Sequence, residues 1–171
     1  MTRKPRGIFE VGYYYHILNR GNNKNNIFKY AEDKGFFQDR FFQYLDDFYV
    51  QPINFCIMNN HFHTEIYIND KSNVSEFMRS LCTSFAMYYN KKYPHTGHVF
   101  QDRYVSKQLF TDAGVLNVYN YIRNNPVKAG LSAIPEDYAW LWEARTVLDR
   151  VLDRNNYPHI PLPPNFPLQL S

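Results

Sequence analysis

The sequence predicts an α+β domain in which a split βαββαβ unit forms one antiparallel sheet and one further helix follows it. The order of the predicted elements along the chain is the first observation behind this fold class. The second is a hydrophobic fraction of 44% in 171 residues, which suffices for one core and excludes wholesale disorder. The third is that the sequence holds no internal repeat and no sign of a second domain. We therefore expect a single domain over residues 1–154 and a tail over residues 155–171.

The first two predicted elements are a strand and a helix. Residues Tyr13–Asn19 alternate and are rich in aromatic side chains, which indicates a strand. The polar stretch Arg20–Asn26 then predicts a flexible loop. Apolar residues at positions i, i+4, i+7, i+8 and i+11 predict an amphipathic helix, namely Phe37, Phe41, Tyr44, Leu45 and Phe48.

A hairpin and a second helix come next. Ile53–Met58 and His61–Ile68 are strand-like, and the two asparagines between them suit a tight turn. A helix is expected to begin near Asn73, because Glu76 three residues later resembles a capping box. The apolar stripe of this helix consists of Val74, Phe77, Met78, Leu81, Cys82 and Phe85.

The last predicted elements are a strand and a helix. Gly97–Phe110 indicates a strand with irregular ends. Asp112 can cap a third helix that reaches Asn124, where Pro126 and Gly130 are expected to end it. The resulting order of elements matches the ferredoxin-like arrangement. Because that fold hosts many functions, the function must be argued from a site.

The C-terminal tail differs in composition from the rest of the chain. Five of the ten prolines lie within residues 155–171. Proline removes backbone donors and favours extended conformations. We therefore expect the tail to be either disordered or strapped across the domain through Ile160, Leu162 and Phe166.

The composition bears on where in the cell the protein resides and on the state of its cysteines. No apolar run approaches the ~20 residues of a membrane span, and no apolar block follows the basic start, so we expect a cytoplasmic protein with no membrane partner. Cys56 and Cys82 are too few for a disulfide framework or a four-thiolate zinc site. Both lie among apolar neighbours and are expected to be buried free thiols.

Charge is unevenly distributed along the chain. Residues 1–30 carry six basic side chains and one acidic one, residues 31–70 carry two and seven, and residues 71–131 carry eight and three. Two basic segments around an acidic one can flank a single polyanion site. Ordinary solvated surface explains the same pattern equally well, and the net charge of +3 does not by itself indicate a nucleic-acid partner.

The tripeptide His61-Phe62-His63 begins the third predicted strand. Strand alternation places His61 and His63 on one face, ~6.6–6.8 Å apart in rise, and Phe62 on the other. Both imidazoles can therefore lean onto one metal ion, although two histidines on an exposed sheet face are also a common surface feature. Glu65 points to the same face, where it is a candidate for a further ligand or for a hydrogen-bond partner of a ligand, and we favour its interpretation as a solvated strand residue.

The third predicted helix carries a second candidate feature. Its buried stripe consists of Val115, Val118, Tyr119 and Ile122. Tyr121 and Asn125 lie one turn apart on the flank of this stripe and can aim at a common point. One interpretation makes Tyr121 available for chemistry beside an amide ligand. The alternative, which helix geometry alone favours, is an amphipathic tyrosine at the edge of the core, with Asn125 as a helix-terminal residue set by the following proline.

Paired motifs in this chain resemble those of the single-tyrosine HUH transposases. Met58–His63 (MNNHFH) is followed about sixty residues later by Tyr121–Leu131 (YIRNNPVKAGL). The second segment closely resembles the Tyr-Ile-x-x-Asn-Pro-Val-Arg/Lys-Ala-Gly-Leu segment of the REP-associated tyrosine transposases. His16–Phe28 and Gly97–Arg103 extend the resemblance, which covers the chain from Tyr13 to Leu131. It implies the HUH fold, in which the last helix carries the catalytic residue.

The resemblance also implies an activity. This activity is cleavage and rejoining of single-stranded, hairpin-containing DNA through a covalent 5′-phosphotyrosine intermediate, as in DNA transposition and recombination. Tyr121 would be the nucleophile, and His61, His63 and Asn125 would hold a divalent Mg²⁺ or Mn²⁺ ion that acts as a Lewis acid. Histidine pairs by general preference suit zinc, copper or iron instead. Such a protein is expected at the nucleoid, as a monomer or a homodimer.

Polar and basic side chains near the motifs are candidate DNA contacts. They are Arg3, Arg6, Arg20, Asn22, Arg103, Lys107, Arg123 and Lys128. Two other function classes stay open. One is a protein that binds hairpin DNA or structured RNA without cleaving it, and the other is a metal-dependent nuclease that uses water, with Tyr121 in a structural role.

Overall fold

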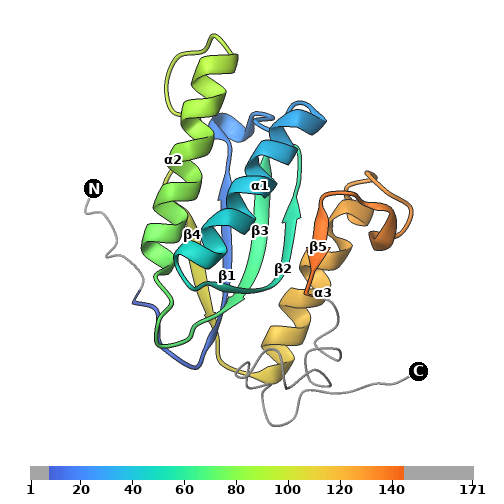
Figure 1. Cartoon of the computed structure of the whole chain (residues 1–171). Coiled ribbons are helices and arrows are strands. Elements are labelled where there is room, and N and C mark those ends of the chain that lie inside the picture. The colour runs from blue at the N-terminus through green and yellow to red at the C-terminus, as the bar shows by residue number, and fades with distance from the viewer. Residues whose placement is uncertain (1–7, 145–171) are drawn as a thin grey trace.

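A computed structural model describes residues 8–144 of the chain, so the predicted tail and the candidate DNA contacts Arg3 and Arg6 lie outside the described residues. Five antiparallel strands form one sheet in the order β4-β1-β3-β2-β5 (Figure 1). The strands are β1 (Tyr14–Arg20), β2 (Gln51–Ile57), β3 (His61–Tyr67), β4 (Val105–Leu109) and β5 (Leu141–Glu143). The four strands β4-β1-β3-β2 have the order of the predicted ferredoxin-like unit, and β5 is added at the β2 edge.

Helices cover both faces of the sheet. The helices α1 (Ala31–Asp47) and α2 (Val74–Lys92) lie side by side on one face (Figure 1). The helix α3 (Asp112–Lys128) packs on the other face, against β2, β3 and β4. Two short 3-10 turns, η1 (Asn22–Lys24) and η2 (Pro135–Asp137), complete the described chain. The α+β fold class is therefore confirmed, and the helix that carries Tyr121 forms a layer of its own.

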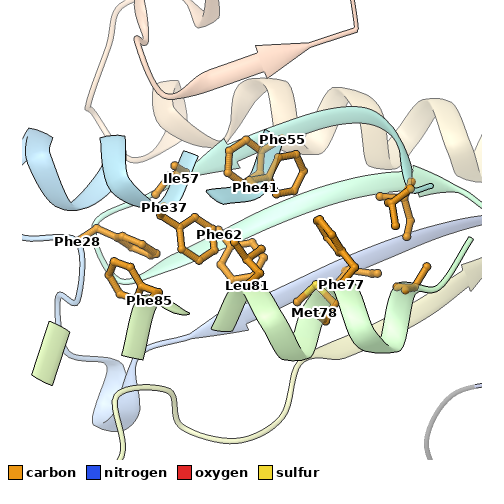
Figure 2. Packing of buried hydrophobic residues seen from close by; sticks show 14 of the residues in the cluster. Phe28, Phe37, Phe41, Phe55, Ile57, Phe62, Phe77, Met78, Leu81 and Phe85 are labelled. Carbon is orange, nitrogen blue, oxygen red and sulfur yellow. The ribbon is translucent and has the colours of Figure 1, made fainter. Parts of the chain in front are cut away.

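The main core lies between the sheet and the pair α1 and α2, and it explains much of the aromatic excess of the sequence. Phenylalanines from both helices meet phenylalanines from β2 and β3 (Figure 2). The Phe41 and Phe55 rings stack with centroids 3.9 Å apart, and Phe37 lies 4.7 Å from Phe62. Offset and edge-to-face aromatic pairs each add ~0.5–1.5 kcal/mol beyond the burial of their area. This face is densely packed and anchors the strands that carry the candidate site.

The predicted helix starts agree with the structure, with one shift. Asn73 caps α2 as predicted, because its side chain accepts a hydrogen bond from the Glu76 backbone N–H. Thr111, and not Asp112, caps α3 by accepting from the Gly114 backbone N–H. Asp112 lies in the first turn instead, where its negative charge suits the helix dipole.

The predicted end of α3 is wrong at Pro126 and right at Gly130. Pro126 lies inside the last turn of the helix, where its ring is buried. Gly130 adopts a left-handed conformation with φ 68°, and the Gly130 and Leu131 backbone N–H groups donate to the Val127 and Pro126 carbonyls. These two hydrogen bonds form the Schellman motif, which ends helices. Gly130 therefore ends α3, whereas Pro126 only removes one backbone N–H donor from the helix.

Two further differences concern strands. The fourth strand is shorter than predicted, because the chain from Gly97 reaches β1 only through an isolated bridge between Gly21 and Phe100. The three-residue strand β5 was not predicted, since so short a segment shows no alternation.

Cys56 is a buried free thiol as predicted, and Cys82 is free and partly buried. Among the described residues, no helix is long and apolar enough to cross a membrane.

Candidate active site

The two motif histidines lie at the start of β3, on the sheet face that α3 covers. Their ring centroids are 4.8 Å apart, and the rings are nearly perpendicular. Phe62 between them points into the opposite layer, where it is fully buried among the phenylalanines. The predicted division of the three side chains between two faces is thus confirmed. His61 is partly buried, whereas His63 is only 4% exposed.

A third imidazole, which the sequence analysis did not single out, completes the cluster. His16 on β1 places Nε2 3.0 Å from Nδ1 of His63, and the two rings lie 5.1 Å apart. The alternation of Tyr13–Asn19 places His16 on one face of its strand. That this face also carries His63 follows only when the pairing of β1 with β3 is known. In that register His16 lies opposite Glu65, one step along the same face from His63.

Tyr121 on α3 faces this cluster. Its ring centroid is 5.4 Å from that of His63 and 6.0 Å from that of His16, with both pairs in edge-to-face geometry. The tyrosine nevertheless stays 42% exposed. Its ring is therefore held beside the histidines while remaining open to a large substrate.

The packing of α3 explains where Tyr121 points. Ile122, the next residue, is fully buried against Cys56 and Met58 of the β2 region. The Asn54 side-chain amide of β2 donates to the Tyr119 carbonyl oxygen at 3.1 Å. These contacts fix the rotation of the helix about its axis, so the predicted flank position of Tyr121 is confirmed. Asn125 follows Tyr121 by one turn and is partly buried.

Burial keeps the three imidazoles neutral at pH 7. Burial is the largest cause that lowers the pKa of His63, to about 2, and the neighbouring His61 and His16 add to it. Burial also lowers the pKa of His16 to about 4, helped by the positive charge of Lys107. The pKa of His61 is lowered by burial and by Arg20. Neutral imidazole is the form that binds metal ions.

The nitrogen atoms of the two motif histidines fit a divalent cation. His61 Nδ1 lies 2.5 Å from the Asn60 side-chain oxygen, which can only accept, so Nε2 of His61 presents a lone pair. His63 Nε2 is buried and has no hydrogen-bond partner among the described residues. Within residues 8–144, no group of three or more His, Cys, Asp and Glu side chains could hold a metal ion. The candidate ligands His61, His63 and Asn125 are not a group of this kind, because the third of them is an amide.

Glu65 is buried, and its interpretation as a solvated strand residue is wrong. The side chain is fully buried beneath α3, and neither carboxyl oxygen has a hydrogen-bond partner among the described residues. Burial raises the pKa of this carboxyl to about 9. Glu65 is therefore a neutral carboxylic acid at pH 7, two residues from His63 on the same face.

The candidate DNA contacts fall into two groups around this cluster. Lys107 is exposed on β4 and pairs with His16 across the sheet, and the Lys128 ammonium lies 5.8 Å from the Tyr121 ring centre. Arg20 ends β1 opposite His61 and donates to the Gln101 side-chain oxygen at 3.0 Å. These three cations border the histidines and Tyr121.

The remaining candidates lie further out or are engaged elsewhere. Asn22 is partly buried in η1, and its backbone N–H donates to the Val99 carbonyl. Arg103 is exposed just before β4. Arg123 forms ion pairs with Glu143, at 2.6 Å, and with Glu136. Its guanidinium links α3 to β5 and η2, so its charge is already compensated within the protein.

The chain is similar to known proteins in sequence and in fold. Residues 10–125 match the sequence model of a family described as "Transposase IS200 like". The chain resembles a solved structure of a REP-associated tyrosine transposase bound to a REP hairpin, with a TM-score of 0.67 and 15% identity over 90% of this chain and 87% of that one.

A second solved structure is a protein from Deinococcus radiodurans R1 that is described as a transposase. It matches with a TM-score of 0.48 and 15% identity over 72% of this chain and 97% of that one. No curated protein sequence matches the chain. The family match spans more than half of the chain and contains His61, His63, Tyr121 and Asn125. The chain therefore belongs to the IS200-like transposase family.

Proposed function

We propose that this protein cleaves and rejoins single-stranded, hairpin-containing DNA through a covalent bond between Tyr121 and the 5′ phosphate. The observation that carries the proposal is the position of the Tyr121 ring, 5.4 Å from that of His63 and yet 42% exposed. A nucleophile needs both contact with the groups that activate the phosphate and an open side for the strand.

The proposed step is a transesterification at the scissile phosphate. The Tyr121 hydroxyl oxygen attacks the scissile phosphorus, and the bond from phosphorus to the 3′ oxygen breaks. The phenol proton is released, and the leaving 3′ oxygen takes up a proton to become a hydroxyl. Because one phosphodiester replaces another, the reverse attack by a 3′ hydroxyl reseals the strand without a nucleotide cofactor.

We assign the divalent ion to His61, His63 and Asn125. The lone pair of His61 Nε2 and the unpartnered Nε2 of His63 support this assignment, with the Asn125 amide oxygen as the third donor. When bound, Mg²⁺ or Mn²⁺ supplies Lewis-acid polarisation of the scissile phosphate. The chain itself keeps both imidazoles neutral through burial and holds Tyr121 at their edge.

We assign the DNA backbone to the cations that border the cluster. Arg20, Lys107 and Lys128 lie on three different elements around the histidines and Tyr121. Phosphate contacts of this kind position a strand without reading its sequence. The likeness in fold to a transposase bound to a REP hairpin supports a hairpin-containing substrate.

A covalent-adduct assay tests the proposal. Labelled single-stranded DNA that contains a hairpin is incubated with the protein and Mn²⁺ or Mg²⁺ and run on a denaturing gel. We expect a covalent band that Tyr121→Phe abolishes. Tyr119→Phe is the matched control, because Tyr119 lies on the same helix but packs against the core near Tyr14 and Tyr67. This variant is expected to keep the band.

Two outcomes would overturn the proposal in favour of the other classes. Cleavage that survives Tyr121→Phe would indicate a nuclease that uses water, with the tyrosine in a structural role. DNA binding without any cleavage by the unmodified protein would indicate a binding protein. Metal dependence is checked in the same assay by adding EDTA, which is expected to remove the band.

A further inference from the structure

We propose that His16 is a positioning residue, which holds the His63 imidazole in the tautomer and orientation that present Nε2 to the divalent ion. The inference rests on the function proposed above. Its basis is the hydrogen bond between His16 Nε2 and His63 Nδ1, at 3.0 Å, in a part of the site where His63 is almost fully buried. Nothing in the His-x-His motif itself determines which nitrogen of His63 carries the proton.

The two possible directions of this hydrogen bond have different consequences. If His16 donates, His63 must carry its own proton on Nε2, where the described residues offer no acceptor. An unsatisfied buried donor of this kind costs ~1–3 kcal/mol. If His63 donates from Nδ1, its Nε2 presents a lone pair, and a bound cation satisfies that lone pair. His16 as the acceptor therefore favours the metal-binding tautomer.

The same arrangement recurs at the other motif histidine. Nδ1 of His61 donates to the Asn60 side-chain oxygen at 2.5 Å. Each candidate ligand thus has an acceptor of its own at Nδ1, an amide oxygen for His61 and an imidazole nitrogen for His63. Such partners orient the ring and raise the basicity of the nitrogen that binds the metal.

The position of His16 in the sheet makes it a rigid partner. The strand β1 lies between β3 and β4, and His16 is paired with Glu65 on one side and with Lys107 on the other. A residue on a strand paired along both edges is held more accurately than one on a loop. His16 also touches the Tyr121 ring in edge-to-face geometry, with centroids 6.0 Å apart. One side chain therefore orients both the ligand and the nucleophile.

The test compares three variants of the full-length chain. His16→Leu removes the acceptor, whereas His16→Gln places an amide oxygen close to the former position of Nε2. Leu18→Met is the matched control, because Leu18 pairs with His63 across β1 and β3 but takes no part in the hydrogen bond. Long-range ¹H–¹⁵N spectra of the metal-free proteins report the His63 tautomer, and calorimetric titration with Mn²⁺ reports the affinity.

We expect His63 to be the Nδ1–H tautomer in the unmodified protein, in His16→Gln and in Leu18→Met. His16→Leu should lose that tautomer and bind Mn²⁺ ~10–100-fold more weakly, since this is the usual effect of removing such a partner. His16→Gln should restore most of the affinity. If His16→Leu fails to fold, His16→Asn replaces it, because the shorter amide stops short of His63.

The result that would overturn the inference is an unchanged tautomer and Mn²⁺ affinity in His16→Leu. A loss of affinity that His16→Gln does not restore would also overturn it, because a merely structural role predicts that pattern. The failure of the proposed function looks different. In that case DNA cleavage survives Tyr121→Phe, or the unmodified protein binds DNA without cleaving it, while the tautomer in the metal-free protein still depends on His16.

Discussion

The Lys128 ammonium lies 5.8 Å from the centre of the Tyr121 ring, across two turns of α3. A cation at this distance is attracted to the ring and also to an incoming phosphate. We predict that Lys128→Met lowers the rate of covalent adduct formation about 2–5-fold, which corresponds to ~0.5–1 kcal/mol for an exposed pair of this type. The rate is measured as the initial slope of adduct against time.

The matched control for this prediction is Lys71→Met. Lys71 makes a similar cation–aromatic contact, 6.0 Å from the Tyr49 ring, but it lies in the exposed loop between β3 and α2. Removal of its charge should leave the adduct rate unchanged. Equal effects of the two substitutions would mean that Lys128 acts only through the net charge of the protein.

Two adjacent asparagines near the end of α3 provide a test of the proposed metal ligands. We predict that Asn125→Ala weakens Mn²⁺ binding and abolishes the covalent adduct, because it removes the proposed amide ligand. Asn124→Ala is the control, since the Asn124 amide donates to the Asn120 carbonyl within the helix at 2.8 Å. Titration calorimetry measures Mn²⁺ binding by both variants, and the denaturing gel measures the adduct. Wild-type Mn²⁺ affinity in Asn125→Ala would remove Asn125 from the ligand set.

Arg123 and Lys107 were both predicted to contact DNA, and the structure gives them different surroundings. The Arg123 guanidinium is paired with Glu143 and Glu136, whereas Lys107 is exposed beside the histidine cluster. We predict that Arg123→Gln lowers the free energy of unfolding by about 1 kcal/mol, as for a partly exposed ion pair, and leaves DNA affinity unchanged. Urea denaturation and fluorescence anisotropy measure the two quantities.

Lys107→Gln should show the opposite pattern. Its stability should stay at the wild-type value, and its DNA affinity should fall with a decrease of about one in the salt slope, as expected for one lost phosphate contact. A salt slope that changes in Arg123→Gln and not in Lys107→Gln would reverse the two assignments.

The sequence was sufficient for the order of the elements because aromatic and aliphatic residues repeat with clear helical or strand periods. The shared face of His61 and His63 and the flank position of Tyr121 follow from the same two periods, and the structure agrees. His16 could not be found in this way, since its role depends on which strand lies beside β3. Periodicity along a chain contains no information on pairing between strands.

Glu65 was misjudged for a related reason, and the ion pairs of Arg123 could not be predicted for the same one. Glutamate on a strand is usually solvated, and only the packing of α3 over the sheet buries Glu65. The ion pairs of Arg123 form only because β5 and η2 bring Glu143 and Glu136 beside it, and its contact with DNA stays a prediction. In both cases the deciding neighbour comes from a distant part of the sequence.

A buried acid at the start of α1 gives a prediction for stability against pH. The Asp33 carboxylate is fully buried and accepts hydrogen bonds from the side chains of Tyr88, Tyr93 and Lys92 and from two backbone N–H groups. Burial acts to raise its pKa, but the hydrogen bonds, from Lys92 first, together hold the pKa below its usual range. The ionised carboxylate therefore stabilises the junction of α1 with the end of α2.

We predict that Asp33→Asn lowers the free energy of unfolding by about 2–4 kcal/mol at pH 7, because it removes the negative charge beside Lys92 and replaces one of the two acceptor oxygens by an N–H donor. A depressed folded pKa means that this stabilisation is fully present above the unfolded value of about 3.9 and is lost as the pH falls through the folded value. The difference between the two proteins, measured by urea denaturation at several pH values, should therefore shrink below about pH 4. Asp47→Asn, at the exposed end of the same helix, should show no such loss, since Asp47 is solvated in both states. A difference for Asp33→Asn that stays constant down to pH 3 would mean that the carboxylate acts through its shape and not through its charge.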